Sequence, residues 1–478
     1  MRAAAALRDA DAKGAYDAFL EDAASCHPEQ LLQQLALPWA TRAHGSHLSV
    51  SSDDVLRRVF NAAFSRIKPY LLADLVRRDP GCCISGDGTF KIAGRVTSSA
   101  TVLHFILGAD HCVVAFAAVK GDGFTPVIPL YMQLRRRLEA MGKLFDVQAV
   151  YSDRCCEQRN DPSTAPQAVI FPGCRRVWGD GWHAINTLIE ATTRSNHPDL
   201  QAFAAAVGKA IRVPHQEDVE ALKRLFIDQA RQQGQMLHPD VAELRALNRG
   251  YAESVRTVGP PGSVIAANLR RVFAKFDKND GERPDSKAPP ERLYRPSGRD
   301  KSQRSTEEVF ENTIRCADKG CLTDPLPFPR MHTLLRVMPK TKRPIYRSVG
   351  QTVKNEALHS KVNKLVDGIS KVGADSMNSR LLLRVFAHNR QRDVEWGRCS
   401  AHEPCPWITA RALCPGAEPP PEPQERMGWD YYRDLCNQQL KDLQDMYDEL
   451  KHANSKGIES MHMVVRSMVL RKMQAKPV

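Results

Sequence analysis

Three acidic residues, Asp87, Asp153 and Glu356, have the side chains that a divalent-cation centre requires. Carboxylate oxygens are the ligands that Mg²⁺ and Mn²⁺ prefer, and two such ions about 3.5–4 Å apart activate a nucleophile, stabilise a leaving oxygen and neutralise a phosphodiester. Three carboxylates suffice because water and the substrate phosphate complete the coordination. We therefore expect Asp87 to bridge two ions, with Asp153 and Glu356 each completing one.

Asp87 lies in the segment Ser85-Gly-Asp-Gly-Thr-Phe-Lys-Ile92. Gly-Asp-Gly is also a common turn sequence, so the segment alone does not define a metal site. The glycines would let a metal and a bulky polyanion approach the carboxylate, and Phe90, Ile92 and Val96 alternate as in a strand. The metal interpretation therefore depends on acidic residues at suitable positions downstream.

A second motif contains Asp180, Trp182 and His183 and leads into a predicted helix over 184–191. In one interpretation Asp180 caps this helix and His183 lies in its first turn. In the other, Asp180 and His183 lie beside the metal ligands and Trp182 stacks on a base. The two interpretations are compatible.

The elements that must position these residues follow from the hydrophobic pattern. We predict strands over 84–96, 101–107 and 112–119, a helix that begins at Pro126, and a strand over 147–151 that ends beside Asp153. Three strands, a crossover helix and a fourth strand with an acidic end are the order of a ribonuclease H-like sheet, in which carboxylates at strand ends meet across neighbouring strands.

The third carboxylate comes from a loop followed by a helix, residues 350–363. Leu358, Val362 and Leu365 would occupy one face of this helix. Glu356 and His359 would occupy another, together with Asn363, and would face the acidic edge of the sheet.

We predict an α/β fold, a ribonuclease H-like mixed sheet flanked by helices and interrupted by a mostly helical insertion, with helical N- and C-terminal regions. The predicted units begin with an N-terminal helical region (1–80), the first part of the catalytic core (81–183) and the insertion with its mobile loop 275–305 (184–349). They continue with the second part of the core (350–398), a Cys/His segment with a Pro-rich linker (399–424) and a helical tail (425–478). The tail either dimerises or packs on its own chain.

Composition favours a polyanionic partner, because 68 Lys and Arg oppose 55 Asp and Glu and give a net charge of +13. A basic soluble enzyme of another kind is the alternative. The 13 cysteines, with no signal peptide recognised, indicate free thiols or zinc in a reducing compartment. No apolar run approaches the ~18 residues of a membrane helix.

Other candidate residues carry charge or metal-binding groups. Lys91, Arg154 and Lys354 adjoin the motifs and would hold phosphates, as would Arg95, Arg175 and Arg176; the run Arg135–Arg137 either does likewise or coats its helix. The cluster Lys340–Arg343 is either a nuclear import signal or solvated surface. A structural Zn²⁺ is a further possibility at a group whose spacing matches no established motif: Cys399, His402, Cys405 and Cys414.

The segments SGDGTFKI, VYSDRCC, GDGWHAI, GCLTDP and GQTVKNEALHSKVN occur in this order over roughly residues 50–400. Together they resemble the eukaryotic cut-and-paste DDE transposases, nearest to the Kyakuja-Dileera-Zisupton, hAT-like and Mutator-like groups. The resemblance implies a catalytic triad of Asp87, Asp153 and Glu356 that cleaves and joins double-stranded DNA with two Mg²⁺ or Mn²⁺ ions. It also implies a homodimer or larger assembly in the nucleus, without membrane association.

The chain departs from this family pattern in two places. We find no N-terminal zinc-binding DNA module, and Val353 and Lys354 stand where smaller polar residues are expected. Two other functions therefore stay open: a catalytically silent DNA-binding or regulatory protein derived from a transposase, and a ribonuclease H-like nuclease without joining activity.

Overall fold

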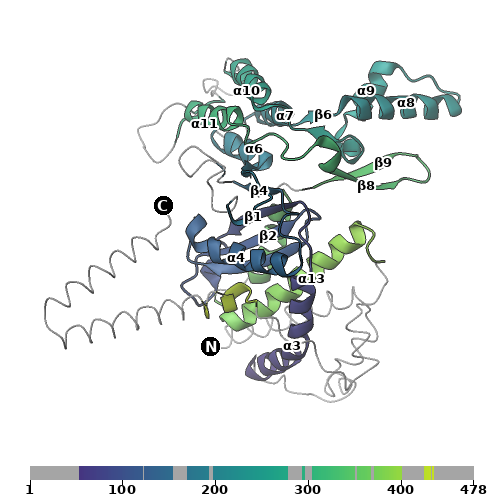
Figure 1. Cartoon of the computed structure of the whole chain (residues 1–478). Coiled ribbons are helices and arrows are strands. Elements are labelled where there is room, and N and C mark those ends of the chain that lie inside the picture. Colours follow the sequence, from purple (N-terminus) through teal and green to yellow (C-terminus); the bar gives the residue numbers. More distant parts are fainter. Residues whose placement is uncertain are drawn as a thin grey trace, which may run out of the picture.

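The computed structural model describes residues 53–121, 123–153, 155, 169–192, 197–277, 293–295, 304–349, 353–367, 371–400, 425–431 and 433–434. Its centre is a mixed sheet of five strands in the order β3-β2-β1-β4-β5 (Figure 1). The strands are β1 (Cys83–Thr89), β2 (Val102–Gly108), β3 (Val113–Val119), β4 (Ala149–Ser152) and β5 (Val177–Gly179). The α/β class and the mixed sheet flanked by helices are thus confirmed.

Pairing within the sheet changes direction at β1. This strand is antiparallel to β2, which is antiparallel to β3, whereas β1 and β4 are parallel, as are β4 and β5. The first three strands are consecutive in the chain: residues 90–101 connect β1 to β2, and residues 109–112 connect β2 to β3. The parallel step from β3 to β4 passes through α4 (Phe124–Ala140), as a parallel connection requires a crossover.

Helices cover both faces of the sheet. On one face, Tyr131 of α4 lies against Gly86 of β1. On the other, α12 (Val353–Asn363) crosses β1 and buries Leu358 and Val362 in the main core. Helix α13 (Ala374–Glu395) covers the edge strand β3, where the Asn389 amide exchanges two hydrogen bonds with the backbone of Val113.

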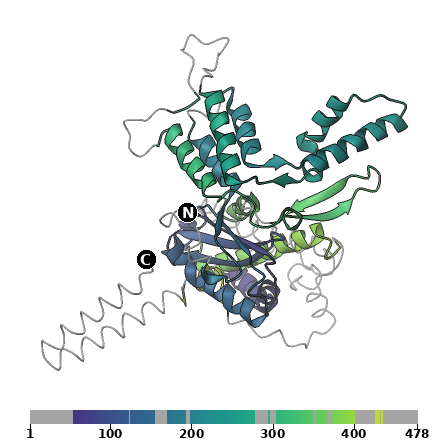
Figure 2. The ribbon, with the colours of Figure 1, turned by 45° about the horizontal axis from the view of Figure 1, so that its top comes forward.

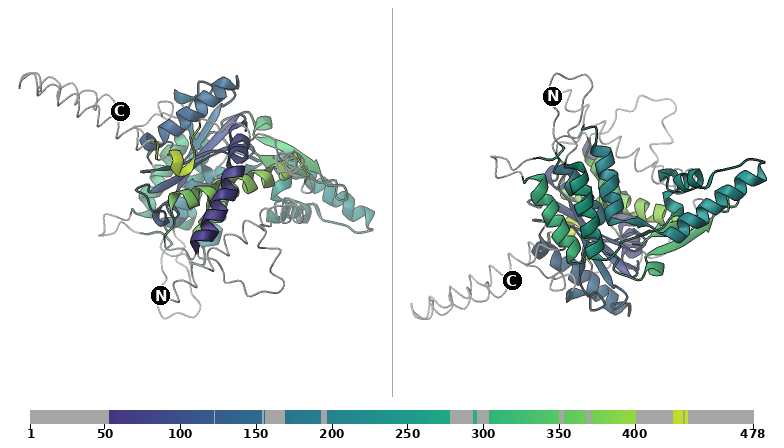
Figure 3. Two further views of the ribbon diagram at one scale, coloured as in Figure 1. Left: turned by 90° about the horizontal axis from the view of Figure 1, so that it is seen from below. Right: turned by 90° about the horizontal axis from the view of Figure 1, so that it is seen from above.

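Helix α3 (Asp53–Val76) packs across α13, as the view from below shows (Figure 3, left). Arg78, just after α3, joins the two helices through carboxylates on each: it donates to Asp74 at 2.8 Å and to Asp393 at 2.9 Å. Short 3₁₀ turns follow β1 at Ala93–Arg95 and α12 at Lys364–Val366.

A second body of helices lies above the sheet (Figure 1; Figure 3, right). It contains α6 (Gly181–Glu190), α7 (Leu200–Ile211), α10 (Gly262–Phe276) and α11 (Thr306–Asp318). Their apolar faces form a core of their own that includes Phe203, Leu269 and Phe310. Because α6 follows β5 directly, the two bodies are connected at the acidic edge of the sheet.

An arm extends from the second body beside a hairpin (Figure 2). The arm contains α8 (Gln216–Gln232), α9 (Pro239–Ala246) and the 3₁₀ turn Arg249–Ser254, and the pair β6 (Val213–Pro214) and β7 (Thr257–Val258) forms its base. The hairpin is β8 (His332–Val337) and β9 (Pro344–Ser348), preceded by the 3₁₀ turn Phe328–Arg330. We did not predict the hairpin, because its strands are half exposed and lack a regular apolar alternation.

The basic cluster Lys340–Arg343 forms the turn of this hairpin. Lys340 and Lys342 are exposed, but Arg343 lies over the Tyr251 ring at 4.9 Å. Gln229 of α8 also donates to the Thr341 carbonyl at 2.8 Å. The cluster is therefore partly engaged by the arm and is not all solvated surface.

Two sequence predictions about the core need correction. The strand predicted over 84–96 ends at Thr89, and Phe90, expected among its alternating apolar residues, is 55% exposed. Within the loop predicted to be mobile, 275–305, α10 extends to Phe276, and Leu293 is buried. Arg295 donates to the carbonyls of Glu190 and Thr192, so residues 293–295 are anchored.

The segment 425–431 docks into the main core. Trp429 is 2% exposed, its backbone N–H donates to Asn378 at 2.7 Å, and its indole N–H donates to Ser98 at 2.8 Å. The start of the predicted tail thus packs on its own chain. Residues 435–478 lie outside the described part of the chain, as do 1–52 and 401–424. No helix among the described residues has the length and apolar character needed to cross a membrane.

Gly86 provides a test of this packing. A Cβ at residue 86 would lie 1.9 Å from the Tyr131 hydroxyl, so Gly86→Ala should lower the free energy of unfolding by about 1–3 kcal/mol through overpacking. Removing the hydroxyl with Tyr131→Phe in the same chain should restore much of the loss. Denaturant unfolding followed by tryptophan fluorescence measures both.

The matched control is Gly94→Ala, because no atom lies within 4 Å of a Cβ at that position. Equal effects of the two glycine substitutions would contradict the packing described here.

Candidate active site

Strand register brings three aspartates to one edge of the sheet. In the parallel pairs, Ser85 is opposite Tyr151, and Ser152 is opposite Gly179. Continuing the same register places Asp87 level with Asp153, and Asp153 level with Asp180. Because neighbouring strands lie about 4.8 Å apart, the three side chains are neighbours although 66 and 27 residues separate them in the chain.

Helix α12 supplies the third carboxylate of the predicted triad. Its position over β1 is fixed by amides that face the strand: Ser85 donates to Asn355 at 3.4 Å, and Thr89 lies 3.5 Å from the Asn363 oxygen. Alternate residues of β1 point to the same face, so Asp87 lies between these two contacts, facing Glu356 and His359.

Two groups of potential metal ligands share Asp87. In each group one donor atom from every residue lies within 4.8 Å of the others. One group is Asp87, Glu356 and His359; the other is Asp87, Asp153 and His183. A carboxylate common to two adjacent groups is the arrangement expected of a bridging ligand. The three residues of the predicted triad are therefore brought together, with Asp87 at the centre.

His183 crosses the space between the carboxylates. Asp180 accepts from the His183 backbone N–H and caps α6, and the same oxygen lies 2.9 Å from Nδ1 of the ring. The other ring nitrogen, Nε2, then faces Asp87 at 3.7 Å and Glu356 at 3.5 Å. Asp180 therefore caps the helix, as predicted, and also holds the His183 ring toward the carboxylates; the contacts with metal and with a base stay predictions.

Burial and charge set the protonation of this cluster. Burial raises the pKa of Asp87 to about 7, with the charges of Asp153 and Glu356 adding to the effect and His183 opposing it. Burial alone would lower the pKa of His183, but the hydrogen bond to Asp180 and the nearby carboxylates outweigh it and raise this pKa to about 9. Burial, together with the charge of His183, lowers the pKa of His359 to about 4. At neutral pH His183 is thus a cation and His359 is neutral.

The donor set fits a hard divalent cation. Asp87 is 8% exposed, and its Oδ2 is buried without a hydrogen-bond partner among the described residues. A buried carboxylate oxygen is costly unless a cation or donor compensates it. Here the positive charge of the His183 imidazolium lies between Asp87 and Glu356 and partly offsets their negative charges. Carboxylates suit Mg²⁺ and Mn²⁺, and the imidazole of His359 would favour Mn²⁺ within that pair.

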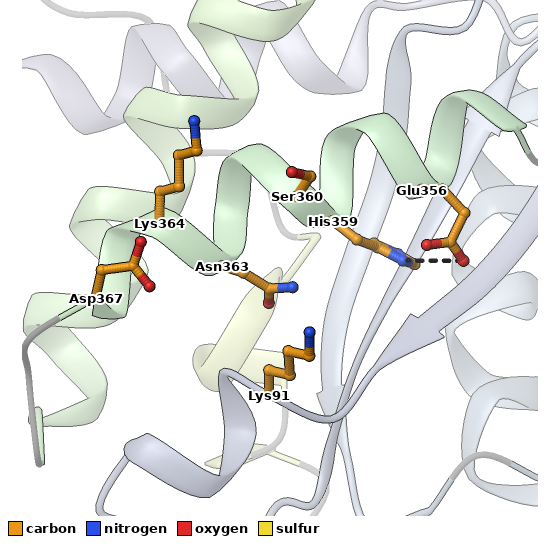
Figure 4. A pocket seen from close by; sticks show the side chains of 7 residues that line it. All are labelled: Lys91, Glu356, His359, Ser360, Asn363, Lys364 and Asp367. Carbon is orange, nitrogen blue, oxygen red and sulfur yellow. Dashed lines mark ion pairs between the residues drawn. The ribbon is translucent and has the colours of Figure 1, made fainter. Parts of the chain in front are cut away.

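A pocket opens beside the cluster along α12 (Figure 4). Glu356 and His359 lie at one end, and the Lys91 ammonium points into the pocket near Asn363. Lys91 is exposed and belongs to the segment that follows β1. Among the predicted phosphate-binding residues whose side chains the structure describes, Lys91 lines the same pocket as Glu356 and His359.

The remaining predicted residues have different positions. Trp182 is half-buried, and its ring is edge-on to the His183 ring, with 5.1 Å between the ring centres. Two arginines proposed for phosphate contacts are structural: Arg176 donates to the Lys319 carbonyl and the Cys321 sulfur, and buried Arg137 donates to the Val114 carbonyl. Several candidates lie outside the described residues or have side chains that do: Arg154, Lys354, His402, Cys405 and Cys414. Cys399 is described and half-buried.

Sequence reasoning missed residues that support the site. Asn355 of α12 is buried against β1. On the opposite face of the strand, the Tyr131 hydroxyl lies 3.5 Å from Nε2 of His104. They also give the glycines a different role from the predicted one: a Cβ at Gly86 would collide with Tyr131, and one at Gly88 would lie 2.7 Å from Val102. The glycines make room for packing behind Asp87 rather than for substrate in front of it. The only sequence signal for Asn355 was its place beside Glu356.

No protein-family model, no curated protein sequence and no solved structure matches this chain.

Proton release on metal binding tests the charge arrangement. Asp87 and His183 hold protons near neutral pH, and a cation at Asp87 would expel them. We expect Mn²⁺ or Mg²⁺ affinity to rise from pH 6 to pH 8 with release of protons. Isothermal titration calorimetry in buffers of different ionisation enthalpy measures this release, and His183→Gln should reduce it.

Asp367→Asn is the matched control, because Asp367 lines the same pocket but belongs to neither ligand group. A binding heat that is independent of the buffer at pH 7 would contradict the proposed protonation.

Proposed function

We propose that this chain is a DDE transposase-like enzyme with a ribonuclease H-like catalytic core, which cleaves DNA and joins strands by metal-dependent phosphodiester chemistry. The observation that carries the proposal is the convergence of Asp87, Asp153 and Glu356 from two strands and a helix, with Asp87 common to both ligand groups. The sheet order β3-β2-β1-β4-β5, with β4 and β5 parallel to β1, agrees with this core.

Two Mg²⁺ or Mn²⁺ ions, when bound, would activate the attacking oxygen and stabilise the leaving one. The residues that would hold them are Asp87 in common, Asp153 on one side and Glu356 on the other. The neighbouring donors differ: His359 is neutral and available as a ligand, whereas His183 carries a proton. The chain's own contribution is rigidity, since a strand pair and a helix packed on β1 carry all three carboxylates.

Basic and aromatic residues around the cluster suit a nucleic-acid backbone. Lys91 supplies a positive charge at the pocket beside Glu356, and the chain as a whole carries a net charge of +13. Trp182 presents part of an aromatic ring next to His183, which suits stacking on a base near the scissile phosphate. Double-stranded DNA as substrate, a dimeric or larger assembly and a nuclear location rest on the resemblance of the motifs.

Removing one carboxylate should separate catalysis from folding. Glu356 is about one third exposed, so Glu356→Gln should leave stability nearly unchanged. It should lower Mn²⁺-dependent nicking of supercoiled plasmid at least about 100-fold, because losing a cation's stabilisation of the transition state costs several kcal/mol. Gel assays of nicking, with DNA binding measured in parallel, test this.

Asp367→Asn, a carboxylate change at the other end of the same pocket, should nick like the unaltered protein (Figure 4). Nicking that survives both Glu356→Gln and Asp153→Asn would remove the catalytic assignment and favour the silent DNA-binding protein.

Joining activity distinguishes the proposed enzyme from a nuclease. A labelled duplex with a free 3′ hydroxyl should become covalently attached to plasmid in the presence of the active chain and Mn²⁺, and the attachment should require Asp87. Cleavage without attachment, over a range of duplex end sequences, would support the nuclease alternative.

A further inference from the structure

Three cysteines from three segments meet beside the acidic edge of the sheet. Cys155 lies two residues after Asp153, Cys316 is near the end of α11, and Cys321 follows the turn at Gly320. The three sulfur atoms lie within 4.8 Å of one another, and those of Cys155 and Cys316 are 3.5 Å apart. Residues separated by 161 positions in the chain therefore place their thiols together.

The surrounding backbone is shaped around this cluster. A Cβ at Gly179 would lie 3.0 Å from the Cys155 sulfur and 3.5 Å from the Cys321 Cβ, so no larger residue fits there without a shift. The Gly179 N–H also donates to the Cys321 carbonyl at 2.8 Å. The end of β5 is thereby joined to the turn after α11, directly against the thiols.

A positive side chain lies at the cluster. Arg176 donates to the Cys321 sulfur at 3.1 Å and to the Lys319 carbonyl at 2.7 Å, and its guanidinium lies 5.1 Å from the centre of the Trp178 ring. Cys155 and Cys321 are buried, at 6% and 0% exposure. A buried centre of three thiolates and one Zn²⁺ carries a net charge of −1, which this guanidinium would compensate.

We propose that Cys155, Cys316 and Cys321 bind a structural Zn²⁺. At a Zn–S distance of ~2.3 Å and tetrahedral angles, bound sulfurs lie about 3.8 Å apart, so the observed separations need only small movements. Thiolates select zinc over the hard cations suited to the carboxylates. Three protein ligands leave one position of the tetrahedron for a further ligand. The proposed ligands are other residues than those the sequence suggested for zinc: Cys399, His402, Cys405 and Cys414.

This metal would brace the catalytic edge. Cys155 continues the segment that bears Asp153, Gly179 precedes Asp180, and Cys316 belongs to the second body of helices. A zinc ion here would fix two strand ends that carry acidic residues to α11. The inference does not depend on the proposed enzymatic function, because metal content is measured without any DNA substrate.

The test uses the full chain expressed in zinc-supplemented medium and compares metal content between variants. Elemental analysis should find about one equivalent of Zn²⁺ fewer in Cys316→Ser/Cys321→Ser than in the unaltered protein. Cys112→Ser is the matched control, a buried cysteine beside Arg78 and Asn389 that belongs to no ligand group, and it should keep its zinc. Cys405→Ser/Cys414→Ser should also retain this equivalent.

A second measurement does not require the variants to fold. Co²⁺ substitution of the unaltered protein should give the d–d bands of a tetrahedral site and a thiolate charge-transfer band. Bound Zn²⁺ should protect Cys155, Cys316 and Cys321 from alkylation until a chelator is added, as mass spectrometry of peptides reports.

Three outcomes would overturn the proposal. The first is a protein without zinc or a thiolate band. The second is a Cys155–Cys316 disulfide recovered from protein kept under native conditions. The third is zinc retained by Cys316→Ser/Cys321→Ser and lost from Cys405→Ser/Cys414→Ser.

Discussion

The parallel register between β1 and β4 is the constraint on which the candidate site depends. It sets Asp87 level with Asp153 because Ser85 is opposite Tyr151, and the next parallel pair extends the row to Asp180. A shift of one residue would turn Asp87 to the opposite face, where Tyr131 and His104 fill the space. Gly86 and Gly88 support this register, because a Cβ would collide with Tyr131 at residue 86 and with Val102 at residue 88.

Carboxylates gathered at one edge repel one another, and the His183 side chain offsets part of this repulsion. Asp87 is buried, so its ionised form is unfavourable, and this explains why its pKa is raised to about 7. Asp180 holds His183 by one ring nitrogen and presents the other to Asp87 and Glu356. An imidazolium therefore occupies the space between two carboxylates, and a metal would take over the same role. Asp180 thus acts on the site through His183.

Positions on both bodies meet at this edge. Helix α12 carries Glu356 from a segment more than 200 residues after Asp153, and its amides fix it to β1. Helix α6 begins at the end of β5 and leads into the second body, whose helix α11 returns to Gly179 through Cys321. The acidic edge is consequently contacted by α12 of the main body and by the turn after α11 of the second body. A polyanion approaching it would meet Lys91 on the side of α12.

Most of the central strands and the acidic residues of the candidate site could be predicted from local sequence patterns. Apolar runs predicted the strands over 101–107 and 112–119, which lie within one residue of the bounds of β2 and β3. Flanking glycines singled out Asp87 and Asp180, the end of a predicted strand singled out Asp153, and a predicted helix singled out Glu356. These signals are local, so they are readable from neighbouring residues. Phe90 misled the prediction because an exposed aromatic residue continued the alternation of β1 by chance.

Which of these residues lie together, and which residues support them, depends on packing between distant segments of the chain. The packing of Asn355, Trp429 and Arg176 depends on partners far away in the chain, and no local pattern records such contacts. The same holds for the thiols of Cys155, Cys316 and Cys321, which have no ligand spacing in the sequence because three separate segments carry them. Protonation is also a tertiary property, since burial and facing charges, rather than residue type, set the pKa of Asp87 and of His183.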